Sequence, residues 1–228
     1  GSTDTIISGV VAGSYSVAIT DANGCSTGAE FTITEPDQLS ASTTQTNVLC
    51  FGNSTGEAAV QISGGVQPYA VLWSNGSTDE AISGLVAGDY SATITDANGC
   101  STSVSVTITE PTKLLASTEQ TDVSCYGGSN GAATVIISGG VEPYGVLWST
   151  SSTDLSISGL VAGDYSATVT DANACTVVVN VTITQPDLLV MALTSTDAVC
   201  YGGNGTATAT VSGGTSPYTY NWVGYPNQ

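Results

Sequence analysis

The sequence predicts an all-β protein made of tandem immunoglobulin- or fibronectin-like β-sandwich modules, and three observations support this. Thr, Ser, Val, Ile, Ala and Gly dominate the composition, which is typical of strands joined by turns. Segments such as residues 89–95 (DYSATIT) alternate apolar and polar side chains, which indicates strands with one buried face. The whole pattern also returns with a period of 75 residues, a length that suits a small sandwich.

The period divides the chain into modules. Cysteines recur 75 residues apart, and so do the prolines that follow Glu or Gln. Residues 36–110 align onto residues 111–185 without a gap. The expected parts are the C-terminal half of a module at 1–35, complete repeats at 36–110 and 111–185, and the N-terminal half of a module at 186–228.

Each complete repeat is expected to hold six strands. In the first repeat they are residues 39–48, 57–62, 69–74, 79–83, 89–95 and 101–110. The tetrapeptide DANG separates the last two, and its Gly99 can take the positive φ of a tight hairpin turn. Ala174 replaces this glycine in the second repeat, so we expect a loss of stability there unless the turn changes type.

Recurring aromatic residues are expected to form the core of each module. One tryptophan per copy lies in a strand where an immunoglobulin-like sandwich buries a tryptophan. One tyrosine per copy ends the segment G-[LV]-V-A-G-[DS]-Y, which resembles the tyrosine corner of such sandwiches. The predicted core residues are Trp73, Trp148, Trp222, Tyr15, Tyr90 and Tyr165. Ligand stacking by these rings is the alternative, and it is disfavoured because the pattern recurs at core positions.

The repeated motif resembles a known family. The pattern C-[FY]-G…SGG-x-x-PY…W…SGL-x-AG-x-Y…T-DANGC…TIT-[EQ]-P, which covers essentially the whole chain, is similar to the SprB repeat of Bacteroidota cell-surface proteins. Such repeats occur in many copies in large secreted adhesins tied to gliding motility and surface attachment. The resemblance therefore implies an exported, extended structural or adhesive protein without catalytic activity.

Six cysteines indicate disulfides and an oxidising compartment, because the chain has no His and no C-x-x-C pair for a metal site. Reduced, buried cysteines are the alternative. Two disulfide pairings respect the period. The pairing that we favour stays within modules and joins Cys50 to Cys100 and Cys125 to Cys175, while Cys25 and Cys200 pair outside the chain. The other joins neighbouring modules as Cys25–Cys50, Cys100–Cys125 and Cys175–Cys200.

Closing a loop within a small module would add roughly 4 kcal/mol to its stability, which favours the first pairing. One objection stands against it. In a simple sandwich the first turn and the last hairpin turn lie at opposite ends, so the loop after the first strand would have to climb back to reach the hairpin.

The charge and the residue types exclude several functions. The net charge is −18, which repels nucleic acids and anionic membrane surfaces, and no apolar run is long enough to cross a membrane. A chain without His and with one Lys cannot assemble a hydrolytic triad or a phosphate loop, so we expect no enzyme and no catalytic residue. No metal site and no cofactor are expected. Calcium stays open because of the negative charge, although no calcium motif occurs.

The expected function is structural: an extracellular fibre or stalk on a bacterial surface. Its expected partners are copies of itself or adjacent repeats of a longer chain. The chain is either a window on a longer protein or a subunit whose terminal half-modules complement each other head to tail, sealed by Cys200 and Cys25 of neighbouring copies. The alternative function is a multivalent module that binds glycans or another surface ligand, within a large secreted adhesin or enzyme.

Overall fold

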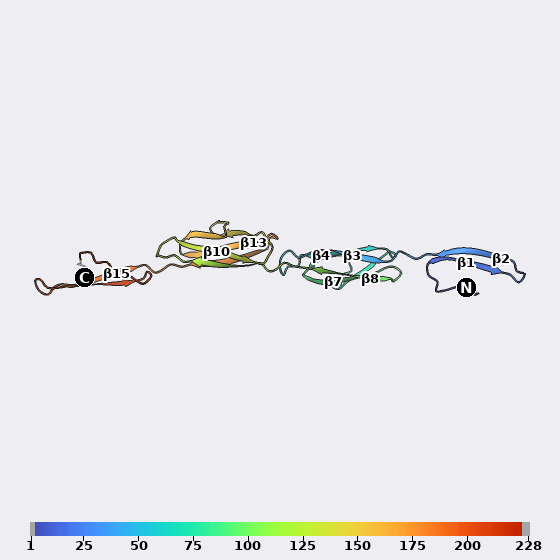
Figure 1. Cartoon of the computed structure of the whole chain (residues 1–228), viewed down its shortest axis with the longest axis horizontal. Helices are drawn as coiled ribbons and strands as arrows, with labels where there is room; N and C mark the ends of the chain where they lie inside the picture. The colour runs from blue at the N-terminus through green and yellow to red at the C-terminus, as the bar shows by residue number, and fades with distance from the viewer. Residues whose placement is uncertain (1–2, 225–228) are drawn as a thin grey trace. The chain divides into compact units, whose positions relative to one another are not determined.

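The structure of the chain is a computed structural model, and it describes residues 3–224. Every regular element in this range is a strand, from β1 to β16, so the all-β prediction is confirmed (Figure 1). The contacts group the chain into two compact units. One contains residues up to Val48 together with Ser54–Thr109, and the other contains Leu49–Asn53 together with the residues from Glu110 onward.

The first unit contains a complete sandwich of two antiparallel three-stranded sheets. One sheet has the order β3-β4-β6 and the other β5-β7-β8, and Figure 1 shows them as two layers. The strands are β3 (Ser40–Thr46), β4 (Gly56–Ser63), β5 (Ala70–Trp73), β6 (Ala81–Leu85), β7 (Gly88–Thr95) and β8 (Ser101–Ile108). This order matches strands A-B-E and C-F-G of an immunoglobulin-like sandwich, which confirms the predicted fold class.

The second unit contains a sandwich with the same topology. Its sheets have the orders β9-β10-β12 and β11-β13-β14. The strands are β9 (Leu115–Thr121), β10 (Gly131–Ser138), β11 (Gly145–Trp148), β12 (Ser156–Leu160), β13 (Gly163–Thr170) and β14 (Thr176–Ile183). All six strands that the sequence predicts for a repeat therefore occur in both complete repeats, with small differences at their ends.

Each unit also contains one strand pair outside its complete sandwich. In the first unit this is β1 (Gly13–Thr20) with β2 (Ser26–Ile33), and in the second it is β15 (Val190–Thr196) with β16 (Thr206–Ser212). By sequence position, β1 and β2 correspond to β13 and β14, whereas β15 and β16 correspond to β9 and β10. Each pair is therefore the equivalent of part of a sandwich.

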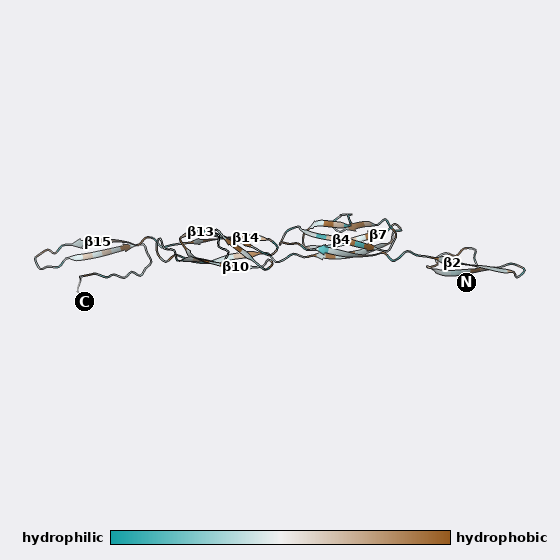
Figure 2. Cartoon of the chain, turned by 90° about the horizontal axis from the view of Figure 1, so that it is seen from above, coloured by the Kyte–Doolittle hydropathy of each residue, from teal (hydrophilic) through white to brown (hydrophobic). Residues whose placement is uncertain are grey.

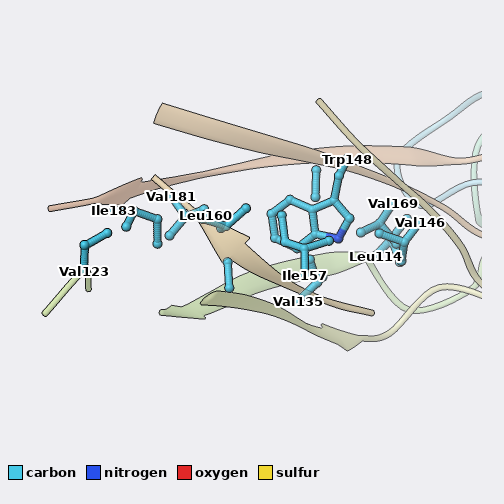
Figure 3. Close-up of a cluster of buried hydrophobic side chains, with 12 residues drawn as sticks. Leu114, Val123, Val135, Val146, Trp148, Ile157, Leu160, Val169, Val181 and Ile183 are labelled. Atoms are coloured by element: carbon cyan, nitrogen blue, oxygen red, sulfur yellow. The ribbon is translucent and has the colours of Figure 1, made fainter. Parts of the chain in front are cut away.

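The core follows from the alternation in the strands. In β7 the inward residues Ala92 and Ile94 are fully buried, while the neighbouring Ser91 and Thr93 are exposed. Figure 2 shows hydrophobic and hydrophilic residues mixed along the strands of the sandwiches. In the second sandwich Trp148 occupies the middle of the buried cluster, with Val181 and Ile183 on one side of the ring (Figure 3).

The predicted core tryptophans differ in their burial. Trp73 and Trp148 are 1% and 2% exposed, and each indole N–H donates a hydrogen bond of 2.9 Å to a carbonyl six residues later. Trp222 is 46% exposed, so its prediction as a core residue is wrong for this structure. The reason is physical: the strand pair β15–β16 has no opposing sheet among the described residues to cover the indole.

The tyrosine corner occurs in all three copies. Tyr15, Tyr90 and Tyr165 each donate a hydroxyl hydrogen bond to the carbonyl of the valine four residues upstream, at 2.8, 3.2 and 3.1 Å. Each of these hydrogen bonds stabilises the turn that precedes the strand of its tyrosine. Tyr90 and Tyr165 pack against the buried clusters of their sandwiches, as predicted, and Tyr15 stacks on Phe31.

The Gly-Gly turn before each Pro-Tyr is hydrogen-bonded to the segment that precedes the first strand of its module. In the second sandwich the backbone N–H of Gly140 donates to the carbonyl of Thr112, and Tyr144 donates its hydroxyl hydrogen to the carbonyl of Gly139. Gly139 has a φ of 66°, and a Cβ there would collide with the carbonyl oxygen of Lys113. Glycine is therefore required at this position.

Candidate junction site

A disulfide is the most distinctive chemical feature of the described chain. It joins Cys50, which follows β3, to Cys175, which precedes β14, and the two Cα atoms are 5.7 Å apart. Both cysteines belong to the second unit, because the segment Leu49–Asn53 is grouped with it. The bond therefore connects the first loop of one repeat with the last hairpin of the next repeat along the chain.

The hairpin that carries Cys175 is organised by a buried carboxylate. Asp171 is 5% exposed, and its Oδ1 accepts the backbone N–H groups of Asn173 and Cys175, both at 2.9 Å. Its Oδ2 accepts the N–H of Val141 at 3.0 Å, which attaches the hairpin to the turn after β10. Since the carboxylate bonds the second and fourth residues after it, the D-A-N-x-C motif presents its cysteine in a defined position.

The hairpin also contacts the Cys50 segment directly. The side-chain amide of Asn173 donates a 2.8 Å hydrogen bond to the carbonyl of Leu49. The backbone N–H of Gly52 donates to Oε2 of Glu110 at 2.6 Å. The side chains of Asn173 and Glu110 therefore hold the loop around Cys50 in place by hydrogen bonds. Sequence reasoning missed both roles, although the repeated DAN and [EQ]-P motifs contain the signal.

The pairing expected from the sequence, Cys50 with Cys100 and Cys125 with Cys175, is wrong in this structure. The loop that holds Cys50 lies near the end of β8, because Thr109 donates its N–H to Asn47 and accepts the N–H of Val48. Cys100 lies before the start of β8. An eight-residue strand spans about 25 Å, far beyond the roughly 7 Å limit of a disulfide between Cα atoms. The objection raised from the sequence was therefore decisive.

The other four cysteines are free and exposed. They are Cys25, Cys100, Cys125 and Cys200. Cys125 and Cys200 are the equivalents of Cys50, and Cys25 and Cys100 are the equivalents of Cys175. Each free cysteine therefore lies in the same loop or hairpin position as one of the two bonded cysteines.

Hydrogen bonds also set the charge state of two aspartates. Burial alone would raise the pKa of Asp96, but the backbone N–H groups of Cys100, Val66, Asn98 and Gly99 lower the pKa below its ordinary value. The pKa of Asp122 is lowered by the backbone N–H and the side chain of Thr184, against a smaller opposing effect of desolvation. These hydrogen bonds therefore favour the ionised carboxylate form of both side chains.

Each loop cysteine is followed by an aromatic residue at the surface. These residues are Phe51, Tyr126 and Tyr201, and all are at least half exposed. Among residues 3–224 there is no group of three or more His, Cys, Asp or Glu side chains that could hold a metal ion. The described residues also contain no helix that is long and apolar enough to cross a membrane.

The topology and the recurring cysteine loops define a tandem β-sandwich repeat protein. The SprB repeat family model matches the chain three times, at residues 42–78, 117–153 and 192–224. The chain therefore contains SprB-type repeats, as its motif predicted. Each match covers the first part of a module, including its cysteine loop. SprB repeats typically occur in surface proteins, so the family indicates an adhesin-type surface repeat region. No curated protein matches the chain.

Proposed function

We propose that the chain is a structural and adhesive repeat region of an extracellular fibre or stalk on a bacterial surface. The observation that carries this proposal is the disulfide between Cys50 and Cys175. It closes a covalent loop that contains strands β4 to β13, which are all strands of the two complete sandwiches except β3 and β14. Tension applied to the two ends of the chain would pass through the sulfur atoms instead of extending the segment between the two cysteines.

The segments between modules support a spacer role. Only six residues separate β8 from β9, and the same number separates β14 from β15. Thr109 bonds the backbone of Val48, and Thr112 bonds Gly140, so the segment is attached by hydrogen bonds near both of its ends. Short, hydrogen-bonded junctions limit the bending freedom that a flexible linker would have.

Single-molecule pulling tests the proposal. The chain is held at its two ends and extended with and without reductant. In the oxidised chain the segment between the two cysteines, which are 125 positions apart, stays out of the extension, and reduction releases about 40 nm of additional length. Cys50→Ser should give the long extension under both conditions, whereas the matched variant Cys125→Ser should behave like the unchanged chain. Full extension of the oxidised, unchanged chain would contradict the proposal that the disulfide carries the tension.

The exposed aromatic residues favour a second candidate function, multivalent glycan binding. Tyr126 follows the loop cysteine and is 55% exposed, and its equivalents recur once per repeat. Aromatic rings at the surface can lie against the apolar faces of sugars. A glycan array probed with the chain would show a signal that Tyr126→Ala lowers and Tyr126→Phe retains. No signal on the array would leave the structural role as the better account.

A further inference from the structure

A groove opens along one side of the second sandwich, between its two sheets. The sheet orders are β12-β10-β9 and β11-β13-β14, and β9 and β14 contact each other at one side of the sandwich. Strands β11 and β12 are therefore the edges at the other side. The groove at this side is lined mainly by apolar side chains, from Val135, Ile137, Tyr144, Gly145, Val146 and Leu155.

The groove exists because β12 is shorter than β10. Their register ends with Thr134 opposite Ser156, and the N–H of Val135 donates to the carbonyl of Leu155. Strand β10 continues to Ser138, and in the described structure no residue of β12 lies opposite its last residues. The space between the sheets is thus open from the side at this point, with Val135 and Val146 buried at its base and Leu155 55% exposed at its rim.

The edge of β11 presents backbone groups beside this groove. Ser149 donates its N–H to Ser166 on β13, whereas Trp148 donates its N–H in the other direction, to Ser152. Because backbone groups alternate in direction along a strand, the N–H and C=O of Val146 also point away from β13. Among the described strands β11 pairs with β13 alone. Val146 therefore offers one donor and one acceptor to an extended chain that lies along β11.

Two residues distinguish this groove from the equivalent region of the first sandwich. Leu155 stands where the first sandwich has the exposed Glu80, a charge of the kind that protects an edge strand from pairing. Gly145 stands where the first sandwich has Ala70. A Cβ at Gly145 would meet the carbonyl oxygen of Thr170 at 3.9 Å, an ordinary contact, so packing within the sandwich does not require glycine there. Glycine on an edge strand does allow another backbone to approach closely.

The charges near the groove indicate what it can bind. The described residues that line it carry no charge. Glu142 lies two residues before Tyr144, and Asp154 directly precedes Leu155, and both are exposed. The whole chain has a net charge of −18 with Lys113 as its single cation, so it attracts cationic partners and repels a second copy of itself. An apolar groove with acidic residues beside it fits an apolar side chain that is flanked by Lys or Arg.

We propose that the β11 edge of the second sandwich binds an extended, cationic peptide segment of another protein. The backbone of the segment adds to β11 at Val146, and one apolar side chain enters the groove beside Ile137 and Leu155. Flanking Lys or Arg residues face Glu142 and Asp154. This site uses neither the disulfide nor Tyr126, so it goes beyond the functions proposed above and its test is independent of theirs.

Binding of a synthetic peptide to the complete chain tests the proposal. The probe is a short, fluorescein-labelled peptide that alternates Val with Thr and carries Lys at each end, and fluorescence anisotropy measures its affinity. One control peptide has Glu in place of Lys, and the other has Ser in place of Val. Both controls should bind about tenfold more weakly than the probe, because one loses the charge complementarity and the other the apolar contact. Hydrogen exchange of the Val146 amide should slow when the probe binds.

A pair of variants with unchanged net charge locates the site. Leu155→Gln should weaken binding of the probe about tenfold, because a polar side chain then lies against the apolar one. It should fold normally, since the first sandwich has Glu80 at this position. Val178→Gln is the matched control: Val178 is 60% exposed on β14, its equivalent in the first sandwich is Ser103, and its replacement should leave the affinity unchanged.

A gain of binding completes the test. Glu80→Leu combined with Ala70→Gly gives the first sandwich the two distinguishing residues, so the number of probe peptides bound per chain should rise from about one to about two. Absence of probe binding, equal binding of the Lys and Glu peptides, or an unchanged affinity in Leu155→Gln would overturn the proposal. So would a neutral oligosaccharide, or a second copy of the chain, that occupies the groove in place of the peptide and is lost in Leu155→Gln.

Discussion

Asn173 donates a 2.8 Å hydrogen bond from its side-chain amide to the carbonyl of Leu49, although 124 residues separate them. Next to this bond, Cys50 and Cys175 form the disulfide. The hairpin of one repeat is thus held to the first loop of the preceding repeat by a hydrogen bond and a covalent bond together. The D-A-N-x-C motif supplies both contacts, since its asparagine and its cysteine lie two residues apart.

The disulfide should stabilise the second unit strongly. We expect the Cys50→Ser/Cys175→Ser double variant to lose about 2–5 kcal/mol in the free energy of unfolding, because the unfolded chain regains the freedom that the closed loop removes. Denaturant unfolding followed by tryptophan fluorescence measures the change. Cys125→Ser is the matched control, and it should stay within about 0.5 kcal/mol of the unchanged chain. Equal effects of the two changes would contradict the assigned bond.

Gly139 should be one of the least replaceable residues of the second sandwich. Gly139→Ala places a Cβ against the carbonyl oxygen of Lys113 at a φ of 66°, so backbone strain and a collision add to a loss of about 3 kcal/mol. Gly159→Ala is the control, with a φ of 75° and open space around the new Cβ, and it should cost about 1 kcal/mol from strain alone. Thermal unfolding of both variants checks the difference between them.

Ala174 should be a site of stored strain. It has a φ of 63°, whereas the equivalent residues Gly24 and Gly99 reach 86° and 82° without the penalty of a Cβ. The turn therefore keeps its type, and the loss of stability expected from the sequence applies. Ala174→Gly should raise the free energy of unfolding by about 1 kcal/mol, and Gly99→Ala should lower it by a similar amount. A neutral Ala174→Gly variant would mean that the turn relaxes in solution.

Asp96 should make the first sandwich sensitive to acid. Burial raises its pKa, but four backbone N–H groups outweigh this and hold the pKa below its ordinary value of 3.8. Because the pKa is lower in the folded state, the carboxylate contributes its full stabilisation above pH of about 4 and loses it as the pH falls through the folded value. Unfolding temperatures measured from pH 7 to pH 2 should fall less steeply for Asp96→Asn than for the unchanged chain.

The strands and the core could be predicted from the sequence because they depend on local alternation. Tyr90, Ala92 and Ile94 alternate with polar residues, and the structure places Ala92 and Ile94 in the core. The tyrosine corner was also predictable, because its hydrogen bond joins residues only four positions apart. The exposure of Trp222 was not, because burial requires an opposing sheet, and no opposing sheet covers β15–β16 in the described structure.

The disulfide could not be predicted from the period alone. Both pairings expected from the sequence join a loop cysteine to a hairpin cysteine close to it in the sequence, whereas the observed bond joins Cys50 to the hairpin cysteine of the next repeat. The deciding fact is three-dimensional: the loop of Cys50 and the hairpin of Cys100 lie at opposite ends of β8. The structural role of Asp171 could not be predicted either, because an aspartate in a turn is usually solvated. Here its carboxylate also accepts a hydrogen bond from the backbone N–H of Val141, which is distant in the sequence.

Mapping of the native disulfide tests the central claim most directly. A protease that cleaves after Asp and Glu places the six cysteines on separate peptides, which trypsin cannot do in a chain with one Lys. Mass spectrometry of the non-reduced digest should find one linked pair of peptides, containing Cys50 and Cys175, with the other four cysteines open to alkylation. Linked peptides for Cys50–Cys100 and Cys125–Cys175 would contradict the account.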